Sequence, residues 1–288
     1  MNGRSAKNKK LSSQENFSLF KKYKSLLLLI PRVIFLSFII ALIIRILSFI
    51  PLLIVYTDTT NINIFFDFSL YSNFVPDRNI LGFIGSALWV TLKLVLLAWV
   101  VSIILGILFL FLKSQYYKLD FLWNVPLSLG GIHVFGLIVI VQHLVAGYVP
   151  FILLVLVLAI GSGSLKEMVY SFEVVYKDVT RKEYWRFMYS QGVHPVRIGF
   201  AELVVRFTEL SFTKLPILLV GSILVEAAAN TKGLGFELLQ AIKALEQNRV
   251  DLNILTGISF TMIFLVLLSQ RLAEYVRLRF DPQSQVQR

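Results

Sequence analysis

The residues that could do chemistry in this chain are few and scattered. The 288 residues include three histidines, at positions 133, 143 and 194, and no cysteine. These histidines lack the close pairing with other His or Cys residues that zinc sites use. The Gly-x-x-x-x-Gly-Lys-Ser/Thr motif of phosphate-binding loops is also absent. The sequence therefore predicts a protein that is not an enzyme, with no metal site and no cofactor of its own.

Charged residues within strongly apolar runs are the remaining candidates for function. A charge at the centre of a membrane helix costs about 2.5–3.5 kcal/mol on insertion scales, and it usually faces a bundle interior or a water-filled path. Lys93 lies about eleven residues into its run, or roughly 16 Å along a helix. It is expected to line a path, to contact a second subunit, or to pair with a carboxylate on another span. Glu209 and Lys214 are the other candidates for a path.

Arg45 lies near the end of the first apolar run. Long basic side chains at such positions commonly extend to the membrane surface, so this residue is expected to place its guanidinium among the lipid headgroups.

The composition indicates which elements must position these residues. Hydrophobic residues make up 57% of the chain, charged residues 16%, and the mean hydropathy is +0.75. Soluble domains have roughly 45–50% apolar and about 25% charged residues. The apolar excess falls in six long runs, at residues 33–55, 82–112, 122–141, 148–163, 207–225 and 253–268. A membrane-spanning helix needs roughly 17–25 residues, so these runs predict six spans.

Helices are expected because backbone groups in lipid must form hydrogen bonds within their own segment. The predicted fold is therefore an all-α membrane protein of six transmembrane helices. We divide it into a basic tail (1–25), the first span with an external loop (26–81), a core of five spans (82–275) and a C-terminal tail (276–288).

Basic residues predict the orientation of the chain. Of the 28 Lys and Arg residues, 21 fall on one side of the predicted spans, 4 on the other side and 3 within spans. Because basic loops stay in the cytoplasm, both termini are expected to be cytoplasmic. The net charge of +11 is spread over four cytoplasmic segments. It is therefore attributed to topology and to attraction for anionic lipid, and not to nucleic-acid binding.

The connection between the fourth and fifth spans predicts two cytoplasmic helices. Apolar residues at helical spacing extend the fourth span into an amphipathic helix, at Val169, Phe172, Tyr176 and Val179. A short helix over 181–191 follows, with one bulky face formed by Tyr184, Phe187, Met188 and Gln191. Gly192 suits the left-handed residue after a helix end, and Pro195 prevents continuation. Aromatic anchoring at the lipid surface and docking to a cytoplasmic partner are both open for this helix.

The segment 226–252 is predicted to lie outside the membrane. Gly233, Leu234 and Gly235 are expected to form a flexible turn. A short amphipathic helix is expected over 236–247, with Leu238, Leu239, Ile242 and Leu245 facing the membrane surface.

These segments resemble the permease subunits of ATP-driven (ABC) importers of the peptide/nickel branch. KEYWRFMYSQG at 182–192 is similar to their cytoplasmic coupling loop, and GSILVE at 221–226 with GLG at 233–235 is similar to their outer segment. Leu238 and Ala241 continue that match, and Asp281-Pro282 agrees with the family's C-terminal end. The resemblance covers about residues 122–282. The chain departs from the pattern at Phe187, Met188, Arg206 and Phe207, where small or polar residues are usual.

The resemblance implies a type I importer architecture in a bacterial plasma membrane. Two permeases would form a path that works by alternating access, two cytoplasmic ATPases would bind ATP and Mg²⁺, and an extracytoplasmic binding protein would deliver peptides or a related small solute. It implies ATPase coupling by Glu183, Tyr184, Arg186, Phe187, Met188 and Gly192, and an external role for Glu226, Gly233 and Gly235. A secondary transporter and a membrane scaffold without an ATPase are the alternatives.

The charge distribution gives a first prediction. Single cysteines introduced at Asn63 and Asn248 of this cysteine-free chain should react with a membrane-impermeant thiol reagent in intact cells, whereas one at Ser190 should react only after permeabilisation. Labelling of Ser190→Cys in intact cells would reverse the predicted orientation.

Overall fold

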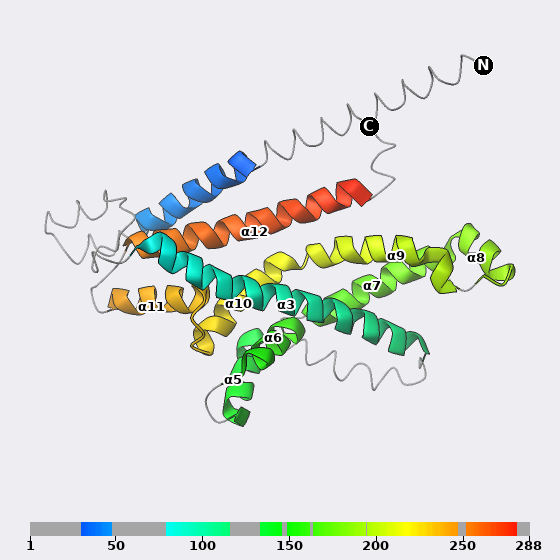
Figure 1. Cartoon of the computed structure of the whole chain (residues 1–288), viewed down its shortest axis with the longest axis horizontal. Helices are drawn as coiled ribbons and strands as arrows, with labels where there is room; N and C mark the ends of the chain where they lie inside the picture. Colours follow the sequence, from blue (N-terminus) through cyan, green and yellow to red (C-terminus); the bar gives the residue numbers. More distant parts are fainter. Residues whose placement is uncertain are drawn as a thin grey trace, which may run out of the picture.

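The computed structural model describes residues 30–47, 79–115, 133–145, 149–161, 164–193, 195–246 and 252–280, and within them the chain is helical with no strand. An N-terminal helix, Ile30–Leu47, precedes the labelled elements. These are α3 (Ile80–Gln115), α5 (Val134–Val145), α6 (Phe151–Ile160), α7 (Ser164–Arg181), α8 (Glu183–Ser190), α9 (Pro195–Phe212), α10 (Leu215–Ala228), α11 (Leu234–Glu246) and α12 (Leu252–Phe280) (Figure 1).

Several of these helices are long and apolar enough to cross a membrane. Three described helices qualify alone: Ile30–Leu47, Leu81–Lys113 within α3, and Leu252–Val276 within α12. Two bent pairs, α6 with α7 and α9 with α10, raise the number to five if each pair forms one span. The described part of the chain is thus all-helical, with three to five candidate spans. In the third predicted span only α5 is described, and its 12 residues are too few to cross alone.

The predicted fifth span is not one straight helix. The chain breaks at Thr213 and Lys214, and the two arms meet at an angle of 41°. Pro216 lies in the first turn of α10. Proline has no N–H group, so it cannot donate to the carbonyl of Phe212, and its ring crowds that position. The break between α9 and α10 therefore has a cause in backbone chemistry.

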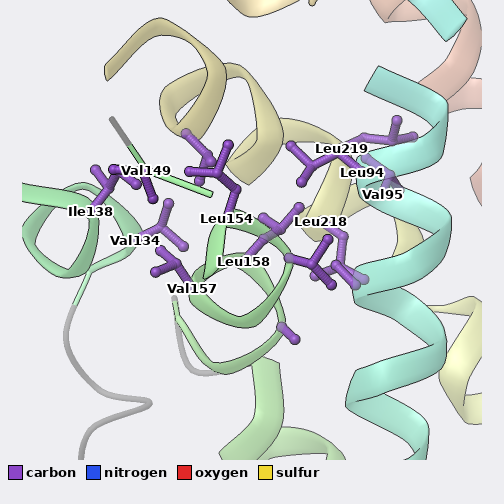
Figure 2. Packing of buried hydrophobic residues seen from close by; sticks show 14 of the residues in the cluster. Leu94, Val95, Val134, Ile138, Val149, Leu154, Val157, Leu158, Leu218 and Leu219 are labelled. Atoms are coloured by element: carbon purple, nitrogen blue, oxygen red, sulfur yellow. The ribbon is translucent and has the colours of Figure 1, made fainter. Parts of the chain in front are cut away.

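The main core lies where α3, α5, α6 and α10 meet (Figure 2). Its buried members are aliphatic and come from all four helices, including Leu94, Val134, Leu158 and Leu218. Gly221 lets α10 approach α6 closely, because a Cβ atom there would lie 2.9 Å from Leu158 Cδ1. The core therefore depends on small residues as well as on large apolar side chains.

A second packing centre joins α7 to α3 and α9. Phe172 is fully buried, and its ring stacks on Phe207 with centroids 4.2 Å apart. On its other side it fills a notch in α3, where a Cβ atom at Gly106 would lie 3.1 Å from Phe172 Cε2. Lys113 of α3 adds an ion pair to Glu173 at 2.8 Å. The amphipathic helix predicted after the fourth span is confirmed, and it is fixed to two neighbours.

Arg45 does not extend to the lipid headgroups, so that prediction is wrong. Its side chain is only 1% exposed, and Nη1 donates to Asn253 Oδ1 at 2.8 Å and lies 3.3 Å from Thr256 Oγ1. A guanidinium carries five N–H donors, so polar acceptors on a neighbouring helix can hold it inside the protein. Arg45 thereby joins the N-terminal helix to α12, and the two helices lie side by side (Figure 1).

The notch at Gly106 yields a second prediction. Gly106→Val should destabilise the purified protein by about 1–3 kcal/mol, because overpacking forces neighbouring side chains to shift. The midpoint of thermal unfolding in detergent should fall. Gly85→Val, at an exposed site on the same helix with nothing within 4 Å of its Cβ position, is the control and should change little. Equal midpoints for the two variants would contradict the packing described here.

Candidate functional site

The short helix α8 presents aromatic side chains to the surroundings. Phe187 is 61% exposed and Tyr189 is exposed as well, whereas Trp185 is buried against the body of the protein. α8 contacts both α7 and α9. The predicted short helix is confirmed, but sequence reasoning missed Trp185, the residue that attaches it. Because Trp185 lies among other aromatic residues, the sequence alone does not indicate which of the rings is buried.

The end of α8 is closed by a regular hydrogen-bonded cap. Gly192 adopts a φ of 78°, in the left-handed region. The N–H of Val193 donates to the carbonyl of Met188 at 3.2 Å, and the N–H of Gly192 donates to that of Tyr189 at 3.0 Å. These two bonds form the Schellman motif, which ends a helix and fixes the direction of the chain after it. The prediction that Gly192 caps this helix is confirmed.

The other predicted coupling residues are part of this helix. Glu183 and Arg186 are exposed, and Met188 is partly buried. The side chain of Tyr184 lies outside the described part of the structure. α8 stands at one end of the molecule, whereas α11 stands near the opposite end (Figure 1). The two surface helices predicted on opposite sides of the membrane are therefore far apart in the fold.

At the α11 end, a buried carboxylate connects three helices. Glu226 was predicted to begin the outer segment, but it lies within α10 and is fully buried. Its Oε2 accepts a hydrogen bond from the N–H of Gly235 in α11 at 2.8 Å and lies 3.1 Å from the hydroxyl of Thr91 in α3. Its Oε1 has no hydrogen-bond partner among the described residues. Glu226 thus belongs to a junction inside the protein.

The two glycines of this segment have a different purpose from the predicted one. Gly233 precedes α11, but Leu234 and Gly235 form its first turn, so the predicted flexible turn is wrong for these two residues. A Cβ atom at Gly233 would overlap the carboxyl group of Glu226, and one at Gly235 would overlap the backbone of Ile223. Neither glycine has a positive φ. Close approach between α10 and α11 explains both residues.

Thr91 is the residue of this junction that sequence reasoning missed. Its hydroxyl accepts a hydrogen bond from the N–H of Leu234 at 2.9 Å, and its proton lies within reach of both Glu226 and the carbonyl of Ala87. A threonine within an apolar helix ordinarily bonds to the carbonyl four residues earlier. Nothing in the sequence indicates a second role, because its partners are 135 and 143 positions away.

The three charged residues proposed for a path have separate surroundings. Lys93 is exposed on α3, and its Nζ lies 4.9 Å from the ring centroid of Trp89, one turn away. Glu209 is partly buried in α9. Lys214 Nζ lies 2.5 Å from Glu167 Oε2 on α7, so an ion pair joins the break between α9 and α10 to α7. Among the described residues, no three His, Cys, Asp or Glu side chains are grouped to hold a metal ion.

In comparisons with known proteins, no family model matches the chain and no curated protein matches it. The function must therefore be inferred from the helices and side chains described above.

The α10–α11 contact gives a third prediction. Gly235→Val should lower the midpoint of thermal unfolding of the purified protein, because the new side chain would overlap the backbone of Ile223. Gly82→Val, with open space at its Cβ position, is the matched control. An unchanged midpoint for Gly235→Val would show that α11 does not pack on α10 as described.

Proposed function

We propose that this chain is a membrane-spanning subunit of an ATP-driven importer of the ABC type I architecture, and that α8 docks into a cytoplasmic ATPase. The observation that carries the proposal is the construction of α8. Among the aromatic side chains of α8 that the structure describes, Trp185 is buried and attaches the helix, whereas Phe187 and Tyr189 are exposed. Exposed apolar area of this kind is typical of a contact surface, and in this proposal the ATPase covers it.

The rigidity of α8 supports docking. An isolated helix of eight residues is unstable in water, since helices shorter than roughly 12–15 residues are marginal. Here the buried Trp185 and the Gly192 cap hold the helix in one orientation. A preorganised helix loses less conformational entropy on binding, which favours affinity for a groove on a partner.

The helices behind α8 give a route for motion into the spans. α7 leads directly into α8, and its Phe172 is held between Gly106 of α3 and Phe207 of α9. Glu173 binds Lys113 of α3 and also Lys177 on α7 itself. In this proposal, displacement of α8 by the closing ATPase pair turns α7, and α7 moves α3 and α9 with it.

The rest of the importer is proposed from the resemblance. Six spans of this chain would pair with a second, homologous or identical permease in the bacterial plasma membrane, with both termini in the cytoplasm. Two ATPases would hold ATP and Mg²⁺, and an extracytoplasmic binding protein would deliver a peptide or a related small solute. Lys93 and Glu209 remain the candidates to face the path, whereas the ion pair with Glu167 favours a structural role for Lys214.

The docking proposal gives a fourth prediction. Phe187→Ala combined with Met188→Ala should weaken ATPase association by about tenfold or more, since buried aromatic anchors commonly contribute about 2 kcal/mol and about 1.4 kcal/mol is a factor of ten. The measurement is copurification of the ATPase with the permease in detergent, followed by titration of the reconstituted complex.

Tyr170→Ala is the matched control, because Tyr170 is an equally exposed aromatic residue on α7. It should leave the ATPase bound. An intact complex in the double variant, with normal membrane insertion, would favour the lipid-anchor role for α8. The absence of any ATPase from the unmodified protein would favour a secondary transporter or a scaffold.

A further inference from the structure

The N-terminus of α11 is held by side chains from two other helices. The N–H of Leu234 donates to Thr91 of α3 at 2.9 Å, and the N–H of Gly235 donates to Glu226 of α10 at 2.8 Å. Most helices satisfy these first N–H groups with a Ser, Thr, Asp or Asn at their own cap position. Here that position is Gly233, which has no side chain. The start of α11 therefore depends on α3 and α10.

The junction has little space for a different arrangement. Leu234 is fully buried in a cluster with Ile84 and Ala87 of α3 and Ile258 of α12. The carboxyl group of Glu226 occupies the space where a side chain at position 233 would lie, and the backbone of α10 fills the space at Gly235. Displacing α11 would expose these contacts and leave the N–H groups of its first turn without acceptors.

We propose that Thr91 is a positioning residue that makes α3, α10 and α11 move as one body. Its hydroxyl is the point that all three helices share, because it contacts both Glu226 and Leu234. α11 is then carried by the spans and does not open separately as a flap. The role of this three-helix unit in transport rests on the proposed importer function. The hydrogen-bonded junction itself does not depend on that function.

The physical reason lies in the cost of unsatisfied polar groups. Leaving a buried N–H or carboxylate without its partner costs more free energy than an intact hydrogen bond contributes to stability. The reason is that the buried group has lost its contacts with water and has no replacement for them. Small displacements of α11 are therefore opposed by at least two such losses at once, and the helices separate together or not at all. Thr91→Val keeps the shape of the side chain and removes its hydroxyl, whereas Thr91→Ser keeps the hydroxyl.

Pulsed electron paramagnetic resonance on the purified chain in nanodiscs can measure the junction directly. Spin labels are attached to cysteines at Ser86 of α3 and Gln240 of α11, both of which are exposed. The native protein has no cysteine, so no other site is labelled. The label pair is placed in three backgrounds: wild type, Thr91→Val and Thr91→Ser.

A single narrow distance distribution is expected in the wild type and in Thr91→Ser, with a broadened or second population in Thr91→Val. Amide hydrogen exchange at Leu234 should become about tenfold faster or more in Thr91→Val and should return towards the wild-type rate in Thr91→Ser. A broad wild-type distribution, or a Thr91→Val protein with the same distribution and exchange rate as the wild type, would overturn the proposal.

The same label pair distinguishes this inference from the function proposed above. With the ATPases bound, the Ser86–Gln240 distance should stay constant between the nucleotide-free and the nucleotide-trapped states. A change in that distance would contradict movement as one body. If the chain binds no ATPase, the importer proposal fails, while the three-background comparison still decides the role of Thr91.

Discussion

Polar groups buried among apolar helices need hydrogen-bond partners, and this fold depends on partners that other helices supply. In an apolar environment a donor or acceptor that loses its hydrogen bond has no water molecule to bond instead, and this costs free energy. Arg45 meets the constraint through Asn253, and Trp99 through the carbonyl of Ser211. Each such pair joins segments distant in sequence. These hydrogen bonds therefore add specific contacts between helices to the apolar packing of the cores.

The same constraint explains what could be predicted from the sequence. Periodicity and capping are local, so the sequence predicts the ends of α8 and α11 to within two residues and the Gly192 cap correctly. The inward turn of Trp185, the partners of Arg45 and the double contact of Thr91 could not be predicted, because each depends on a residue far along the chain. Gly233 and Gly235 were recognised as notable, but their purpose is close packing against α10, which only the neighbouring helix reveals.

Small residues and a proline shape the helices that connect the two ends of the molecule. Gly106 leaves space for the ring of Phe172, and Gly221 leaves space for Leu158. Pro216 lies at the bend between α9 and α10. These features lie on α3, α6, α7 and α10. Well-packed contacts of this kind transmit displacement, because a dense interior is not easily compressed. A subunit that converts a cytoplasmic movement into a change of its spans needs this property.

Site-specific photo-crosslinking from α8 in native membranes tests the central claim most directly. A photoreactive amino acid at Phe187, which is 61% exposed, would report the nearest neighbour of α8, to be identified by mass spectrometry. The proposed function predicts crosslinked peptides from a cytoplasmic protein that carries a phosphate-binding-loop motif. Crosslinks confined to lipid, or to peptides of this chain alone, would contradict it.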